Sequence, residues 1–311
     1  MAVKGKGNTP LALLLLTPGF AAVGFLLRRW QAATAFEFTS GLLTPGKPAT
    51  YALVAWLGLV AVVTVVLAWR ALRGKTPKGY LANFAAPNLG VGIATLVAGA
   101  VLFAGGVLGI RDFALHMDAR VARLVLGLCL VPCGVCVGLV GLLGQQRQEG
   151  KGRFAGVLLA PGYCACVWLL VAYQGHTANP NMMEYVFLLL GIVCAVFACY
   201  ASSSFSFEKP LPVGYAASSA MGVVLLAVAG ADRPWGMDAL ILWGFALYLY
   251  VQLVCLLFCR MRPPKLKGWT PLTQEEETAP EEPREETLED ILEEFTAEPE
   301  KQVQPRGEED E

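Results

Sequence analysis

The chain has 311 residues, of which 55% are apolar and 16% charged, and its formal net charge is -1. This near-neutral total hides two regions of opposite charge. Of the 25 acidic residues, 17 lie between Glu275 and Glu311, where only three basic residues oppose them, whereas the rest of the chain is basic and apolar. The composition therefore places most of the chain in a membrane and leaves a solvated acidic tail. The basic residues are scattered without interleaved aromatic residues, so no nucleic-acid partner is expected.

Eight apolar segments are long enough to cross a bilayer, because about 20 residues at about 1.5 Å each span a hydrocarbon core of about 30 Å. Backbone amides find no water in that core, so the spanning segments are expected to be helices. The predicted fold is an all-α polytopic membrane protein with eight transmembrane helices, followed by a disordered acidic cytoplasmic tail. The segments are 10–27, 50–69, 88–110, 121–144, 154–173, 184–203, 211–231 and 236–259.

The orientation follows from the Lys and Arg residues in alternate loops, which are enriched on the cytoplasmic side. With a cytoplasmic N-terminus, fourteen of them lie in inner loops and seven in outer loops, among them Arg28 and Arg29. We therefore expect both termini in the cytoplasm and the protein in the plasma membrane. Asp238 is expected at the outer end of a helix, where capping and the helix dipole explain a carboxylate.

The two halves of the chain share three short patterns in the same order. "LLLLTPGFAAVGFLL" at 13–27 resembles "GVLLAPGYCACVWLL" at 156–170, and "PKGYLA" and "MDA" in the first half have later counterparts in "PVGYAA" and a second "MDA". This predicts two parallel four-helix units, at 1–153 and 154–263, related by an axis along the membrane normal. Chance similarity between segments rich in Leu, Ala and Gly is the alternative.

Each half carries a Pro-Gly pair inside its first helix. Pro18 and Pro161 lack the N–H that would bond the carbonyls of Leu14 and Val157, so both helices are expected to bend there. Released carbonyls at matching positions can face a transported solute. The predicted solute-binding residues are Leu14, Pro18, Gly19, Phe20, Val157, Pro161, Gly162 and Tyr163.

The alternative for these pairs is that Pro-Gly only permits close helix packing. Glycine spacing in two other helices suggests packing of that kind. Gly105 and Gly109, and Gly134 and Gly138, are expected to let the third and fourth transmembrane helices approach each other.

No catalytic, metal or cofactor site is predicted. All nine cysteines lie in apolar segments, including "CGVC" at 133–136, where Cys acts as a small hydrophobic residue. A membrane thiol oxidoreductase would need a second cysteine pair in a loop. The only histidines, His116 and His176, are expected in outer loops, where they could neither face each other across a haem nor complete a zinc site. The protein is therefore expected not to be an enzyme.

The acidic tail, 264–311, has too little apolar surface to offset the cost of ordering it. One stretch differs: in "ETLEDILEEF" at 286–295, four apolar residues share one helical face, and Thr287 with Asp290 resembles a capping box. We expect a short amphipathic helix near 286–296 that binds a groove on a cytosolic protein. Incidental apolar residues, or a tail that covers the protein's own basic inner face, are the alternatives. The predicted partner-binding residues are Leu288, Ile291, Leu292 and Phe295.

Two functions are consistent with these features. The first is a non-enzymatic scaffold or assembly factor that recruits a cytosolic partner through its tail. The second is a permease for a small uncharged or apolar solute, with its site at the paired Pro-Gly bends. A polar cavity at Pro18 and Pro161 would favour the permease, and dry packing there would favour the scaffold.

Overall fold

A computed structural model describes residues 8–37, 43–44, 46–74, 76–77, 79–115, 121–145, 155–176, 182–207, 209–233 and 235–264. Eight long helices account for most of these residues, and each is long and apolar enough to cross a membrane. This confirms the predicted all-α polytopic class. The helices are α1 (Asn8–Thr34), α2 (Pro48–Leu72), α4 (Leu89–Leu115), α5 (Val121–Leu143), α6 (Ala155–His176), α7 (Met182–Ser204), α8 (Pro212–Gly230) and α9 (Met237–Met261).

The helix boundaries follow local chemistry in some places and differ from the predicted segments in others. Pro48 and Pro212 occupy the first turns of α2 and α8, where a missing N–H costs nothing. The largest difference is in α1, which continues to Thr34 instead of ending near residue 27. Arg28, assigned to an outer loop from the sequence, is therefore part of a helix, and that assignment was wrong.

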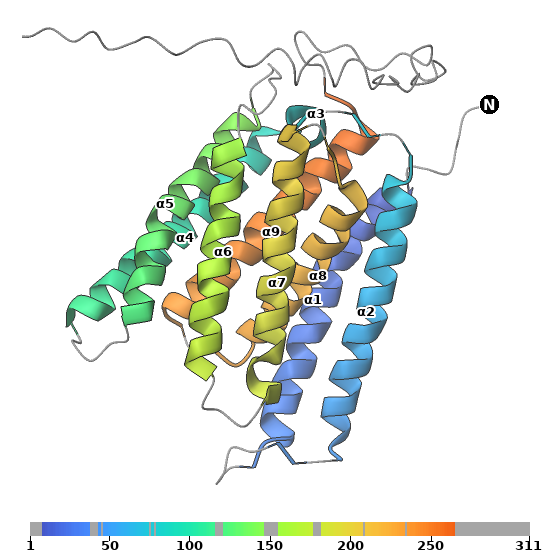
Figure 1. Cartoon of the computed structure of the whole chain (residues 1–311). Coiled ribbons are helices and arrows are strands. Elements are labelled where there is room, and N and C mark those ends of the chain that lie inside the picture. The colour runs from blue at the N-terminus through green and yellow to red at the C-terminus, as the bar shows by residue number, and fades with distance from the viewer. Residues whose placement is uncertain are drawn as a thin grey trace, which may run out of the picture. The chain divides into compact units, whose positions relative to one another are not determined.

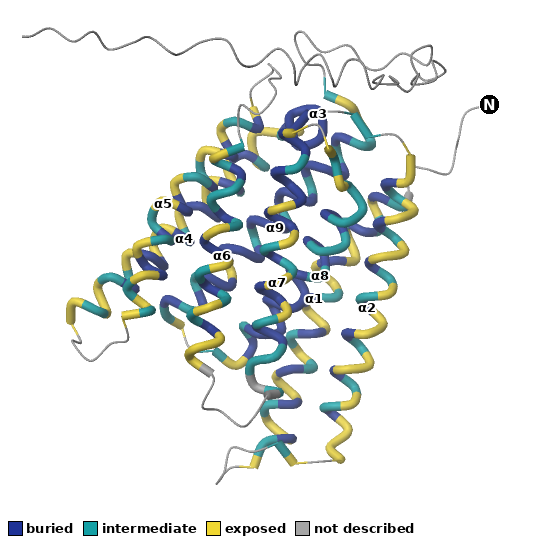
Figure 2. The backbone as a smooth tube through the Cα atoms, viewed as in Figure 1, coloured by how far each residue is buried: buried dark blue, intermediate teal, exposed yellow. Residues whose placement is uncertain are grey.

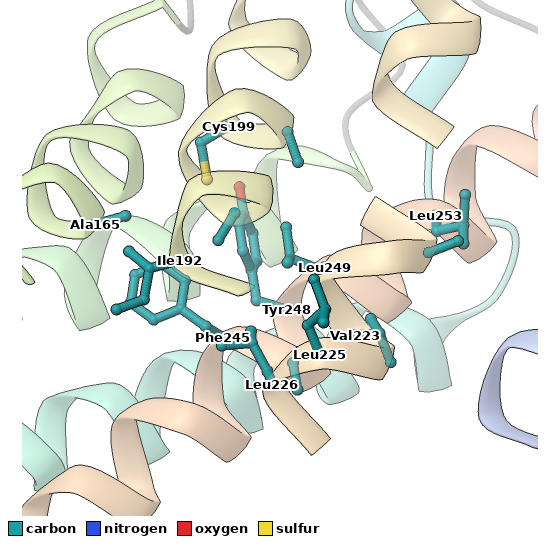
Figure 3. Packing of buried hydrophobic residues seen from close by; sticks show 14 of the residues in the cluster. Ala165, Ile192, Cys199, Val223, Leu225, Leu226, Phe245, Tyr248, Leu249 and Leu253 are labelled. Carbon is teal, nitrogen blue, oxygen red and sulfur yellow. The ribbon is translucent and has the colours of Figure 1, made fainter. Parts of the chain in front are cut away.

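The last two helices form the centre of the bundle. In the most apolar stretch of α9, 72% of the residues are buried, and in that of α8, 67% are. The corresponding share is 28% in both α1 and α2. Figure 1 shows α9 running obliquely through the bundle, and Figure 2 shows the burial concentrated along it. Side chains of α7, α8 and α9, including Ile192, Leu225 and Phe245, gather where these helices meet (Figure 3).

Helices of the two predicted four-helix units share one core. From the second unit, α8 packs against α1 and α2 of the first, and α9 packs against α4. The described residues therefore do not separate into two bundles at the boundary between 153 and 154. Whether the two units arose by duplication stays a prediction.

Glycines bring α4 and α5 into backbone contact. Three glycines on each helix recur at seven-residue intervals and meet in antiparallel pairs. A Cβ built on Gly99 would lie 2.6 Å from the carbonyl oxygen of Gly134, and one on Gly106 would lie 2.9 Å from that of Gly127. Small residues are what permits such close approach in a membrane. The pairs are Gly92 with Gly141, Gly99 with Gly134, and Gly106 with Gly127.

The predicted glycine contacts were half correct. Gly134 and Gly138 do face α4, since both have backbone atoms within 2.7 Å of a Cβ built on Gly99. Gly105 and Gly109 have α9 as their nearest neighbour, with Leu240 opposite the first and Met237 opposite the second, although a Cβ on Gly109 would also lie 3.6 Å from Gly127 Cα on α5. The prediction missed that α4 has two glycine faces, because α9 packs on its other side.

A short segment between α2 and α4 crosses the end of the bundle that holds both the start of α1 and the end of α9 (Figure 1). It contains α3 (Leu81–Phe84), whose four residues are all buried. The Tyr80 ring stacks on Phe84 at 4.9 Å, and Phe84 meets Phe205 and Tyr215 edge-on at 5.0 Å each. The Tyr80 hydroxyl donates to Gln252 Oε1 at 3.3 Å, and burial raises the pKa of Tyr80 well above its usual range. Aromatic packing thus closes this end of the bundle.

Candidate functional site

The first Pro-Gly pair lies at the surface of the bundle. Pro18 and Gly19 are exposed, Phe20 is half-buried, and a Cβ built on Gly19 would meet nothing within 4 Å. The carbonyl of Leu14, which Pro18 leaves without its helical donor, instead accepts a hydrogen bond from the Tyr250 hydroxyl at 3.3 Å. The released carbonyl is thus used inside the protein.

An apolar hollow of about 450 Å³ lies beside Pro18, between α1, α8 and α9. Aromatic side chains of Phe25 and Trp243 form part of its wall, and their rings lie 6.3 Å apart. Apart from the Tyr250 hydroxyl and the Trp243 indole nitrogen, its lining side chains carry no polar atom. The remaining residues that line it are Ala21, Ala22, Val223, Ala227, Ala246 and Leu247.

The second Pro-Gly pair lies on a different helix with different neighbours. Pro161 is buried in α6, Tyr163 is exposed and Val157 is half-buried. A Cβ on Gly162 would lie 3.3 Å from that of Cys199, so this turn packs closely on α7. Since α1 packs mainly on α2 and α8, whereas α6 packs mainly on α5 and α7, the structure does not gather the eight predicted residues into one site.

A buried arginine, which the sequence analysis missed, lies near the opposite end of α1. This is the end predicted to face outward, and we call it the predicted outer end. Arg28 is only 1% exposed, and its Nη2 and Nε donate to Oδ2 of Asp232 at 2.6 and 3.0 Å. Its Nη1 donates to Gln31 Oε1 at 2.8 Å and to the carbonyl of Met183 at 3.0 Å. We call these contacts the Arg28 network.

The Arg28 network joins four parts of the chain. Gln31 also donates to Thr50 Oγ1 at 3.1 Å, which adds α2, and the guanidinium carbon lies 5.5 Å from the centre of the Phe187 ring on α7. A buried charge is tolerated only when it is paired and hydrogen-bonded. The network therefore ties α1 to α2, α7 and the turn after α8. A signal was present in the sequence: Arg28 follows an apolar run that continues as Trp30 and Ala32 to Ala35.

A second feature of the predicted outer end is a cavity of about 660 Å³ between α5, α6, α7 and α9, which we call the outer cavity. Its floor is apolar and its rim carries charged and polar side chains. The floor consists of Leu126, Trp168, Val171, Ala172, Leu188, Met237 and Leu242, and the polar rim side chains are Arg123, Gln174, Arg233 and Asp238.

An adjoining hollow of about 270 Å³ extends the outer cavity toward α4. The two share Arg123, Arg233, Met237 and Asp238, and Asp112 lines only the smaller one. The Arg233 Nη1 and Asp238 Oδ2 atoms are 4.0 Å apart, with 20% and 48% of the two side chains exposed. Asp238 does lie in the first turn of α9, as expected, but it also borders this cavity.

The cysteines behave as packing residues in the described helices. Cys133, Cys164 and Cys199, from α5, α6 and α7, are buried, and all nine cysteines are free thiols. Among the described residues, no group of three or more His, Cys, Asp or Glu side chains is arranged to hold a metal ion. His116 and the tail residues Leu288, Ile291, Leu292 and Phe295 lie outside the described residues.

Comparisons with known proteins do not narrow the function: no family profile, no curated protein and no solved structure matches the chain. The class of the protein therefore rests on its own geometry. Eight apolar helices of membrane-spanning length, with lipid-compatible Leu, Val and Phe side chains over their exposed faces, define an integral, multi-pass α-helical membrane protein in a lipid bilayer.

Proposed function

We propose that this protein is a non-enzymatic scaffold or assembly factor of the plasma membrane, with both termini in the cytoplasm, that recruits a cytosolic protein through its acidic tail. The membrane helices act as the anchor and the tail as the recruiting element. The observation that carries the proposal is the hydrogen bond from Tyr250 to Leu14 at the first Pro-Gly bend. It uses the group that a permease would otherwise offer to a solute.

The surroundings of both Pro-Gly pairs support the same interpretation. The hollow beside Pro18 is almost wholly apolar, and Pro161 is buried in a helix turn that packs on α7. A permease built from inverted or parallel repeats binds its substrate with polar groups at interrupted helices. Among the described residues, neither pair is lined by a polar cavity of the kind that would favour the permease, and this supports the scaffold.

The recruiting element is the stripe of Leu288, Ile291, Leu292 and Phe295, which lies outside the described residues. On a helix these side chains share one face, and acidic side chains surround it. A groove with an apolar floor and a basic rim would complement such a helix. The charges would speed association and make it sensitive to salt, because screening sets in beyond about 8 Å at physiological ionic strength.

The experiment is co-purification of cytosolic proteins with the full-length chain in lipid nanodiscs. Leu292→Asp places a charge within the stripe, whereas Ala297→Asp adds the same charge just past the expected helix, outside the stripe, and serves as the control. We expect the first variant to lose a specific partner, with membrane insertion unchanged, and the second to keep it. If both variants retain every partner of the wild type, the tail is not a recruiting element.

A second candidate function, a permease for an uncharged or apolar solute, is favoured by the hollow beside Pro18. Its volume of about 450 Å³ lies within the range of small-molecule sites. Ala22→Trp would fill the hollow, and Ala55→Trp would add the same ring on an exposed face of α2, outside it. If the protein is a permease, cells that express the wild type or Ala55→Trp should lose a lipophilic dye such as Nile red faster than cells that express Ala22→Trp. Equal rates in all three strains would rule this function out.

A further inference from the structure

The floor of the outer cavity is a rigid apolar surface. Leu126, Leu188 and Leu242 are buried, and the ring of Trp168 is held in place by stacking on Phe245, with centroids 5.4 Å apart and planes 19° apart. Offset stacking of this kind fixes an aromatic side chain in one orientation. An apolar group that enters the cavity therefore meets a surface that is already formed.

The rim of the outer cavity brings together cationic side chains from distant parts of the chain. Arg123 extends from the first turn of α5, and Arg233 follows the end of α8. Asp238 is the one carboxylate among the described residues that line the larger cavity, and Asp112 lies farther off, in the adjoining hollow, so the two arginines outnumber the carboxylates only in the larger cavity. An anion is therefore attracted to the part of the larger cavity between Arg123 and Arg233, away from Asp112.

The contact between Arg233 and Asp238 does not prevent such binding. At 4.0 Å, with both side chains partly exposed, it is a loose ion pair of the kind that contributes little to stability. A guanidinium presents five N–H donors in a planar fork that suits a carboxylate or phosphate. A ligand anion can therefore compete with the present partners of Arg233, Asp238 among them, while it contacts Arg123.

We propose that the outer cavity binds an amphipathic organic anion: a molecule with one carboxylate or phosphate group, held by Arg123 and Arg233, and an aromatic or branched apolar body that packs on Trp168 and the leucines below. The volume of about 660 Å³ suits a ligand of that size. This site goes beyond the scaffold function, since it depends neither on the tail nor on the Pro-Gly bends. The anion has two possible sources, a free solute or the phosphate headgroup of a membrane lipid.

Binding is tested on the purified full-length chain with two pairs of probes. Indole-3-propionate and its neutral amide test a free solute by microscale thermophoresis. Phosphatidylglycerol and uncharged diacylglycerol test a lipid by native mass spectrometry. In at least one pair we expect the anionic member to bind saturably and the neutral member to bind about ten-fold more weakly, since bonds to a charged group are about twice as strong as neutral ones.

Variants assign the binding to this cavity. Arg123→Gln and Arg233→Gln should each weaken binding of the anionic probe by about ten-fold. Asp238→Asn should strengthen binding of the anionic probe by about five-fold, because the substitution removes a negative charge that repels the ligand. Arg111→Gln is the matched control: Arg111 is exposed at the same end of α4 and is not among the residues that line either hollow.

The source of the anion follows from which pair of probes responds to the arginine variants. A response in the indole pair supports a free solute, a response in the lipid pair supports a headgroup, and a response in both supports the shared chemistry. The proposal is overturned if acid and amide bind equally and the two lipids do so too. It is also overturned if Arg111→Gln weakens binding as much as Arg123→Gln and Arg233→Gln.

Discussion

The α4–α5 pair and the Arg28 network hold helices together in opposite ways. Between α4 and α5, six glycines remove side chains so that backbone atoms touch. Around Arg28, a long charged side chain reaches across and hydrogen-bonds Asp232, Gln31 and the backbone at Met183. The α4–α5 contact depends on the absence of side chains, whereas the Arg28 network depends on hydrogen bonds between particular polar groups.

The difference reflects how helices associate in a bilayer. Lipid tails are as apolar as Leu, so burying a leucine between two helices gains little over leaving it in lipid. Close van der Waals packing of small residues and interhelical polar contacts are the remaining sources of stability. This protein uses one in each region, which makes the two regions sensitive to different substitutions.

The largest effect is expected in the Arg28 network. Asp232→Asn should lower the free energy of unfolding by about 3 kcal/mol, because it removes the carboxylate that two guanidinium nitrogens of buried Arg28 contact. Thermal unfolding can be followed with a thiol-reactive dye, since buried Cys133, Cys199 and Cys255 become reactive only when the helices separate. The double variant Arg28→Met, Asp232→Leu should be less destabilised than Asp232→Asn alone. A double variant that is worse would mean that packing, not charge pairing, dominates there.

The glycine contact should be the next most sensitive. Gly99→Ala should lower the free energy of unfolding by about 2 kcal/mol, because its Cβ would lie 2.6 and 2.7 Å from backbone atoms of Gly134 and Gly138, which cannot rotate away. Gly90→Ala, on the same helix with nothing within 4 Å, is the control and should be neutral or slightly stabilising. The same dye assay measures both, and equal losses would argue against backbone contact.

A smaller loss is expected at the first Pro-Gly bend. Tyr250→Phe removes the donor to the Leu14 carbonyl and should cost about 1 kcal/mol, the typical net value of one hydrogen bond. Pro18→Ala restores a helical N–H for that carbonyl, so Tyr250→Phe should cost less when it is made in that background. A double-mutant cycle measures the coupling, and no coupling would mean that Tyr250 does not compensate for the proline.

The smallest effect is expected at the exposed ion pair. Asp238→Asn should change the free energy of unfolding by less than about 1 kcal/mol, because the 4.0 Å contact with Arg233 is partly solvated. Asp232 and Arg233 are adjacent in the chain, so this variant and Asp232→Asn compare a close ion pair that contains a fully buried guanidinium with a longer, partly exposed one at the same end of the bundle. A large loss on Asp238→Asn would place the rim of the outer cavity among the structural contacts.

The membrane class, the number of spanning helices and most of their boundaries were determined by the sequence alone. A run of about 20 apolar residues has few alternatives in a bilayer, because each unpaired amide there is costly. The missing helical hydrogen bond at Pro18 is also a local property, since proline removes a donor wherever it is placed in a helix. The sequence also predicted that glycines bring the third and fourth transmembrane helices together, although it named Gly105 and Gly109 where Gly92, Gly99 and Gly106 make the backbone contacts.

Apart from the contact between α4 and α5, the tertiary structure decided what depends on which helices are neighbours. It placed Arg28 inside the bundle, because α1 continues past its apolar run and Asp232, more than 200 residues later, arrives beside it. It separated Pro18 from Pro161 by packing α1 and α6 against different helices, and it assembled the outer cavity from α5, α6, α7 and α9. Side-chain spacing along one helix records which residues share a face, but the partner of that face depends on the packing of the whole bundle, which local sequence does not contain.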